Sequence, residues 1–240
     1  MSDQRLVDST KQLIPVHVDG MQEYIMSTWT KELAKQQYGA QLKGSTLPDD
    51  VIRKAAAELA YIFEPHAGKL KLRVLEPFCG NGVASAILNA ALVPFVDVWI
   101  STDILTPTSP SFQGFGVFKE MDAVVSVKEH PYANLLLLVA PPPAEPPPLV
   151  LPPPRTIPTF QGYGDYFACR DFIQQSTKRR YIVFIGELSA GDGSQGMLRY
   201  LTEHKQLTLV CRKELCRMTI AKLTLCKELF LFKTNTPIKQ

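Results

Sequence analysis

The stretch Val74-Leu75-Glu76-Pro77-Phe78-Cys79-Gly80-Asn81-Gly82 decides the fold of this 240-residue chain. An apolar run over residues 70–75 ends at the Glu76 carboxylate, a glycine-rich turn follows, and a helical segment over 83–92 comes next. This order of strand, turn and helix is typical of a parallel sheet that binds a nucleotide-type ligand beyond the carboxyl ends of its strands. Glycines in the turn let the backbone approach a ligand without a Cβ in the way.

A second acid closes the next apolar run. Asp103 follows residues 95–100 and lies about 20 residues past Gly82, where a ribose-binding carboxylate is expected. The segment also fits the pattern Gly80-x-Gly82-x-x-Ser85, a degraded dinucleotide fingerprint. A pyrophosphate above this turn would face the Glu76 carboxylate, and like charges repel. The acid therefore favours a cationic ligand without phosphates, such as S-adenosylmethionine with its ammonium and sulfonium groups.

In this segment the chain resembles the class I (Rossmann-like) S-adenosylmethionine-dependent methyltransferases, whose first motif is an acid followed by a glycine-rich turn. Residues 76–82 are most similar to the Asp-Pro-Phe-x-Gly-x-Gly variant of methyltransferases that modify amino groups of bases. The motifs cover roughly residues 70–145, and the order of strands and helices extends the resemblance to about residue 235.

The resemblance implies a cofactor site at the first strand ends. Glu76, Gly80 and Gly82 would line the methionine end of the cofactor, and Asp103 would hold the ribose hydroxyls. Asp122 lies where the third motif of the family places an acidic or polar residue near the adenine. The structural alternatives are a capping role for Glu76 and an ordinary strand-end acid at Asp103. The implied cofactor-binding residues are Glu76, Phe78, Gly80, Asn81, Gly82, Asp103, Ile104, Asp122 and Ala123.

The resemblance places the methyl-transfer site at the carboxyl end of the fourth strand, framed by Ala140, Pro141 and Pro142. Amino-group methyltransferases carry (Asp/Asn/Ser)-Pro-Pro-aromatic there, and the first residue and a backbone carbonyl accept hydrogen bonds from the target nitrogen. This chain keeps the two prolines, but Ala140 has no side-chain acceptor and Pro143 has no ring system for stacking. Since methyl transfer depends largely on proximity and in-line orientation, the alanine does not exclude catalysis.

Alternating strands and helices predict an α/β fold, a doubly wound, mostly parallel Rossmann-like sheet flanked by helices. Residues 1–45 are expected to form a helical N-terminal extension, and residues 46–240 a methyltransferase-like domain with a Pro-rich insert at 141–158. The resemblance implies an antiparallel final strand. The first helix of residues 46–240 should have Pro48 in its first turn. The predicted strands are 71–75, 96–102, 116–118, 134–140, 181–185, 207–212 and 228–234, and the further helices are 83–92, 123–127, 166–177 and 195–203.

Three segments near the expected active site allow more than one interpretation. Residues 141–154 contain nine prolines and would form a substrate-facing loop, a partner-docking segment or a loop without specific function. Residues 160–167 combine aromatic residues with glycines, as in a base-stacking loop or a turn into a capped helix. Glu187 and Asp192 would contact substrate, whereas Asp192 and Ser194 fit helix caps equally well.

The composition, 45% apolar and 20% charged, is that of a globular protein. No apolar run approaches the roughly 20 residues that span a bilayer, and the first residues lack an apolar signal core. These features predict a cytoplasmic protein (nuclear is the alternative in a eukaryote) without a membrane partner. Five cysteines without metal or CxxC spacing predict reduced thiols, with Cys79 as a small filler rather than a nucleophile, and four dispersed histidines predict no metal site.

Together these features predict a methyltransferase that uses S-adenosylmethionine and acts on RNA, DNA or protein. The basic bias of the C-terminal half and the net charge of +3 would attract a nucleic-acid backbone, although solvated surface charges explain the same residues equally well. The alternatives are a methyltransferase-like scaffold that has lost catalysis, suggested by Ala140 and the Pro-rich insert, and a nicotinamide-dependent enzyme, disfavoured by Glu76 and Ser85.

Overall fold

The computed structural model of the protein describes residues 47–80, 82–103, 117–141, 164–175, 179–187, 192–220 and 223–235. The expected N-terminal extension over 1–45, Asn81, Ile104 and the Pro-rich insert from Pro142 onward lie outside the described residues.

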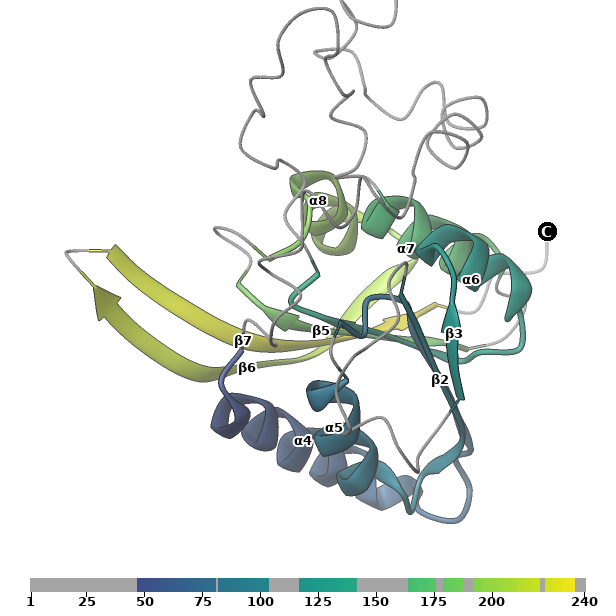
Figure 1. Cartoon of the computed structure of the whole chain (residues 1–240), viewed down its shortest axis with the longest axis horizontal. Coiled ribbons are helices and arrows are strands. Elements are labelled where there is room, and N and C mark those ends of the chain that lie inside the picture. The colour runs from purple at the N-terminus through teal and green to yellow at the C-terminus, as the bar shows by residue number, and fades with distance from the viewer. Residues whose placement is uncertain are drawn as a thin grey trace, which may run out of the picture.

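A seven-stranded sheet organises the molecule, in the order β3-β2-β1-β4-β5-β7-β6 (Figure 1). Strands β1 to β5 pair in parallel, and β7 runs antiparallel to both of its neighbours, β5 and β6. The strand order reverses between β1 and β4. This confirms the predicted doubly wound, mostly parallel sheet with an antiparallel final strand. The strands are β1 (Leu72–Glu76), β2 (Val96–Asp103), β3 (Val117–Glu120), β4 (Leu135–Val139), β5 (Tyr181–Gly186), β6 (Leu207–Ile220) and β7 (Leu223–Thr234).

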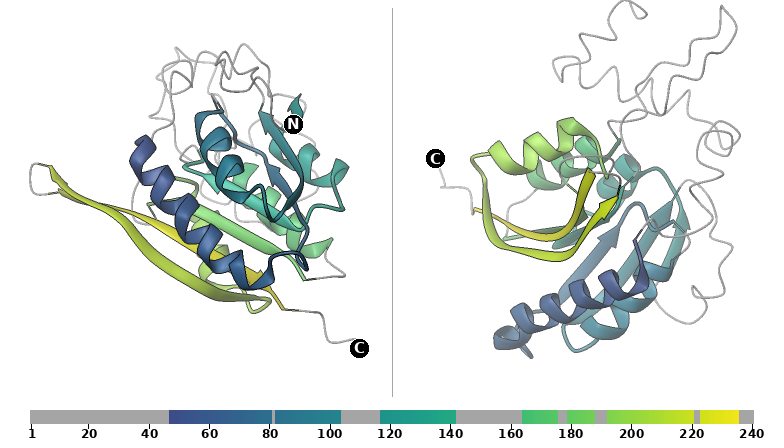
Figure 2. Two further views of the ribbon diagram at one scale, coloured as in Figure 1. Left: turned by 90° about the horizontal axis from the view of Figure 1, so that it is seen from below. Right: turned by 90° about the vertical axis from the view of Figure 1, so that its left-hand side faces the viewer.

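Helices cover both faces of the sheet, with α4 and α5 on one face and α6, α7 and α8 on the other (Figure 2). Among the described residues, no helix is both long enough and apolar enough to cross a bilayer. The helices are α4 (Asp49–Phe63), the short 3-10 helix η4 (Glu64–His66), α5 (Val83–Leu92), α6 (Ala123–Glu129), α7 (Gly164–Gln174) and α8 (Gln195–Glu203).

Strand β4 lies in the centre of the sheet and shows why a continuous apolar run is needed there. Leu136 and Leu138 belong to the core under α6, α7 and α8, whereas Leu135, Leu137 and Val139 belong to the core under α4 and α5. Successive side chains of a strand point to opposite faces, so a strand buried on both faces has to be apolar at every position.

Several element boundaries differ from the prediction, among them those of α4, β6 and β7. Pro48 is the N-cap of α4 rather than a residue of its first turn, and the helix begins at Asp49. Strands β6 and β7 are longer than predicted, and residues 223–227 of β7 pair with β6 beyond the end of β5. The two strands therefore form a ribbon that projects past the sheet (Figure 1). The predicted strands, 207–212 and 228–234, leave out residues 213–220 and 223–227 of this ribbon.

Candidate active site

The Gly80 turn joins β1 to α5 at the carboxyl edge of the sheet. Gly80 and Gly82 have φ angles of +55° and +79°, in the left-handed region that favours glycine. The Gly80 N–H donates to Asp103 Oδ2 over 2.9 Å, and the Cys79 N–H donates to the Thr102 carbonyl over 3.2 Å. The turn is therefore fixed to the end of β2. A Cβ on Gly80 would meet no heavy atom of the described residues within 4 Å, so that side of the turn is open.

Glu76 is fully buried at the end of β1, where it connects three elements. Its Oε2 accepts hydrogen bonds from Ser85 Oγ at 2.5 Å, Ser101 Oγ at 2.9 Å and Trp99 Nε1 at 3.2 Å. Ser85 lies in α5, and the other two donors lie in β2. Glu76 Oε1 is buried without a hydrogen-bond partner among the described residues. Burial raises the pKa of Glu76 above its ordinary value, and the three donors oppose this shift.

Cys79 is buried within the same turn. Burial, followed by the nearby Glu76 and Asp103 carboxylates, raises the pKa of the Cys79 thiol well above its ordinary value. The thiolate is the nucleophilic form of cysteine, and these surroundings disfavour it. These surroundings therefore support the prediction that Cys79 is a small residue that fills space in the turn and is not a nucleophile.

The remaining described members of the predicted cofactor set have structural contacts. Asp122 is the N-cap of α6 and accepts hydrogen bonds from the N–H groups of Val124 at 2.8 Å and Val125 at 3.4 Å. Burial raises the pKa of Asp122, and the backbone donors oppose this. Ala123 is buried in the core, and Phe78 packs against the same core. An adenine contact by Asp122 and Ala123 stays a prediction.

The end of β4, predicted to frame methyl transfer, has a strained backbone. Ala140 has a φ angle of +40°, a conformation that costs a non-glycine residue roughly 1–2 kcal/mol. The Ala140 N–H donates to the Ile185 carbonyl at 2.8 Å, and the Pro141 carbonyl accepts from the Gly193 N–H at 2.7 Å. These bonds to β5 and to the segment before α8 hold the strained residue in place. Backbone strain of this kind is concentrated at functional sites.

A buried polar network lies beside Pro141. Ser194 caps α8 and accepts from the Met197 N–H at 3.0 Å. Its own N–H and hydroxyl donate to Asp165 at 2.6 Å and 2.7 Å. A Cβ built on Gly193 would lie 3.3 Å from Asp165 Oδ2 and 3.4 Å from Pro141 Cγ, so the carboxylate is close to the end of β4. Burial raises the pKa of Asp165 to about 6, while the donors from Ser194 oppose the shift.

An ion cluster lies on the same edge of the sheet. Lys227 Nζ lies 2.6 Å from Asp192 Oδ2 and 3.7 Å from Glu187 Oε2, and the Glu187 N–H donates to Asp192 at 2.8 Å. All three side chains are largely buried. The cap of α8 is Ser194, so the alternative that Asp192 caps this helix is wrong. Contact of Glu187 and Asp192 with substrate stays a prediction.

Asp165 and Lys227 were missed as site residues from the sequence. Asp165 lies in the aromatic segment 160–167, where an acid in the first turn of a helix is ordinary. Lys227 meets Asp192 only because β7 inserts beside β5, and no local pattern indicates that pairing. Residues 160–163 of the aromatic segment lie outside the described stretches.

No protein-family model and no curated sequence matches this chain. Solved structures with a similar fold include an rRNA methylase from Streptococcus thermophilus (10% identity, 75% of this chain and 96% of that chain covered, TM-score 0.44). Two others are in complex with SAH: magnesium protoporphyrin IX methyltransferase from Synechocystis PCC 6803 (8%, 86% and 100%, TM-score 0.47) and the plantazolicin methyltransferase BpumL (11%, 96% and 100%, TM-score 0.45). At such identities the fold assignment rests on the strand order and directions given above.

The backbone of Ala140 leads to a stability prediction. Ala140→Gly should leave the free energy of unfolding unchanged or raise it by up to about 1 kcal/mol, because glycine relieves the left-handed strain. Ala56→Gly, in the middle of α4, should lower it by about 1 kcal/mol or more. Urea denaturation of both variants measures the difference. Equal destabilisation by the two substitutions would show that Ala140 is not strained.

The buried Asp165 predicts a pH dependence of stability. Its pKa is higher in the folded chain, about 6, than its ordinary 3.8, so it favours folding at low pH and this contribution is lost as the pH rises through about 6. The unfolding free energy of the wild type minus that of D165N should therefore fall by about 2 kcal/mol between pH 4 and pH 7. Denaturant titrations at several pH values measure it. A difference for D165N that stays constant with pH would contradict the assignment.

Proposed function

We propose that this protein is an S-adenosylmethionine-dependent methyltransferase that acts on a macromolecular acceptor, nucleic acid or protein. The observation that carries this proposal is the pair of acids at adjacent strand ends, Glu76 on β1 and Asp103 on β2, with the Gly80 turn between them. The pair lies next to the point where the strand order reverses between β1 and β4, and open α/β sheets bind their ligands there.

The residues around the turn fit this cofactor. The open side of Gly80 allows a ligand to approach the backbone closely. Glu76 Oε1 is a buried acceptor without a partner among the described residues, and an ammonium group would supply the donor that it lacks. A pyrophosphate brings no N–H donor and would add negative charge beside two carboxylates, which disfavours a dinucleotide. Ser85 occupies the position of the third glycine of a dinucleotide fingerprint, and its hydroxyl donates a hydrogen bond to Glu76.

The proposal assigns separate tasks to the residues of the turn. Glu76 would stabilise the cationic methionine end of the cofactor, and Asp103 would hold its ribose hydroxyls. The backbone at Gly80 and Gly82 would form the surface on which the cofactor lies. Asp103 accepts the Gly80 N–H, so its carboxylate is held beside the turn that would carry the cofactor. When bound, the cofactor supplies an activated methyl group, so the chain needs mainly to orient the acceptor and exclude water.

The acceptor would lie at the end of β4, between Ala140 and Pro142. Because Ala140 has no polar side chain, orientation of the acceptor depends on backbone groups at this bend. Asp165 would act here as a positioning residue: it holds Ser194, and the adjacent Gly193 N–H holds the Pro141 carbonyl. The acceptor class, nucleic acid or protein, follows from the motif similarity and the basic C-terminal half rather than from this geometry.

Isothermal titration with S-adenosylmethionine, SAH and NADH tests the cofactor assignment. The wild type should bind the first two at micromolar concentration. E76Q and D103N should weaken binding at least tenfold, because each removes one carboxylate charge with little change in shape. D97N is the matched control, since it removes an exposed acid from the same strand, β2, and should bind like the wild type.

The other outcomes separate the alternatives. Binding of NADH in place of S-adenosylmethionine would overturn the proposal in favour of a nicotinamide enzyme. Cofactor binding without transfer of labelled methyl groups to RNA, DNA or protein would indicate a scaffold. Circular dichroism of each variant distinguishes loss of a ligand contact from loss of the fold.

A further inference from the structure

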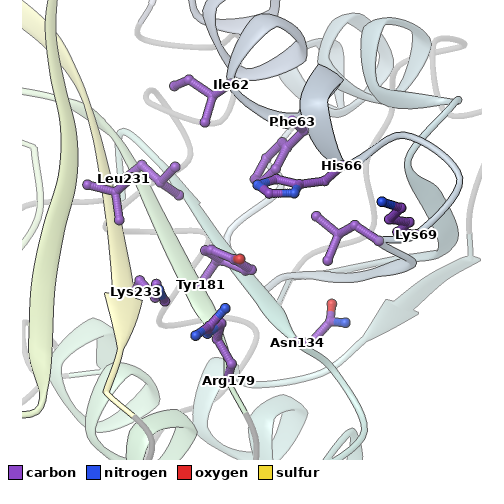
Figure 3. Close-up of a pocket in the computed structure, with 11 residues that line it drawn as sticks. Ile62, Phe63, His66, Lys69, Asn134, Arg179, Tyr181, Leu231 and Lys233 are labelled. Carbon is purple, nitrogen blue, oxygen red and sulfur yellow. The ribbon is translucent and has the colours of Figure 1, made fainter.

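Two neighbouring hollows lie at the amino-terminal edge of the sheet, opposite the candidate active site. The first has a volume of about 420 Å³ and is lined by the end of α4, the segment before β1, the start of β5 and the end of β7 (Figure 3). The second, about 410 Å³, lies beside it, and Asn134 and Arg179 line both. Asn134 is fixed between them, because its side chain accepts from the Arg73 N–H and donates to the Lys71 carbonyl, both at 2.8 Å.

Both hollows have several basic residues in their lining, which in the first hollow stand beside apolar side chains. No aspartate or glutamate of the described stretches lines either of them. Like charges gathered on a concave surface raise the local positive potential and attract anions. The basic residues are His66, Lys69, Arg179 and Lys233 in the first hollow, and Lys71, Arg73, Arg179 and Arg180 in the second.

Two of these cations have structural partners. Arg73 lies 3.4 Å from Asp97, and the buried Arg180 stacks on Phe172 with its guanidinium carbon 4.8 Å from the ring centroid. Arg180 also donates to the carbonyls of Phe172 and Pro131.

The other cations are uncompensated. Lys69, Lys71, Arg179 and Lys233 form no ion pair with any residue in the described part of the chain. Because no carboxylate of the described residues neutralises them, these four charges are available to a bound anion along this edge.

Each hollow also contains a tyrosine. Figure 3 shows Tyr181 in the middle of the first hollow, with Lys69 and Lys233 on opposite sides of it. The Tyr181 ring is fixed edge-on against Phe63, with 5.7 Å between ring centroids. Tyr132 lines the second hollow and is 47% exposed. Aromatic rings interspersed with cations in a groove are typical of surfaces that bind single-stranded nucleic acid, since bases stack on the rings while cations follow the phosphates.

We propose that this edge binds single-stranded nucleic acid across the two hollows. Phosphates would contact Lys69, Lys71, Arg179 and Lys233, and bases would stack on Tyr181 and Tyr132. Each hollow has the size of a pocket for one small ligand, but uncompensated cations in both, with Arg179 shared between them, favour a chain of phosphates over a single anion. The five to six residues of β4 and β5 separate this edge from the candidate active site by about 17–20 Å. The surface therefore anchors a nucleic-acid strand away from the candidate active site and does not present the reacting base there.

Fluorescence anisotropy with a labelled 20-nucleotide oligouridylate tests this proposal. The double variant R179Q/K233Q should weaken binding at least tenfold and reduce the slope of log affinity against log salt by about 1.4, since each single-strand phosphate contact contributes about 0.7. The matched control K54Q/R199Q removes the same charge from exposed positions on α4 and α8 and should change the affinity less than twofold. Y181L should weaken binding about fivefold or more with the salt slope unchanged, whereas Y61L, at a residue 73% exposed elsewhere, should have no effect.

The remaining outcomes overturn the proposal. Equal losses in R179Q/K233Q and K54Q/R199Q would show that net charge alone attracts the oligonucleotide. Equal affinity for four and for twenty nucleotides, with competition by millimolar inorganic phosphate, would indicate a single-anion site. If R179Q/K233Q weakened binding to phosphatidylserine vesicles but not binding to RNA, this edge would be a membrane-binding surface. Because the oligonucleotide is titrated without S-adenosylmethionine, a failure of the cofactor assignment leaves this test unaffected.

Discussion

The buried Glu76 carboxylate is the constraint on which the rest of the site depends. A charge removed from water is costly unless it is hydrogen-bonded, and here the donors come from the first turn of α5 and from β2. The same requirement fixes the glycine turn between these elements, because the turn has to leave β1, bond to Asp103 and enter α5 within a few residues. One oxygen of Glu76 remains without a partner among the described residues, which makes the site receptive to a cationic donor.

The two edges of the sheet differ in the charges that they gather, although the chain as a whole has a net charge of only +3. Carboxylates gather at the carboxyl ends of the strands, at Glu76, Asp103, Asp165, Glu187 and Asp192. Uncompensated cations gather at the amino ends. This separation agrees with a cationic cofactor at one edge and an anionic polymer at the other, and it gives the two proposals independent physical grounds.

The sequence contained enough local information to predict the central sheet and the cofactor turn. The leucines of β4 and the segment from Glu76 to Gly82 are contiguous, so their meaning does not depend on distant residues. Other features arise only from tertiary contacts. Lys227 meets Asp192 through the insertion of β7, and Lys69, Arg179 and Lys233 come together from three separate segments. The left-handed backbone at Ala140 was equally unpredictable, because alanine gives no signal for it.

Hydrogen–deuterium exchange of the full chain with and without saturating SAH tests the central claim most directly. If Glu76 and Asp103 hold the cofactor, amides in the Gly80 turn and at the end of β2 should exchange more slowly in the presence of SAH. Amides at the amino-terminal edge, around Asn134 and Tyr181, should be unaffected. Protection confined to that opposite edge, or no protection of the Gly80 turn, would contradict the assignment of the cofactor site.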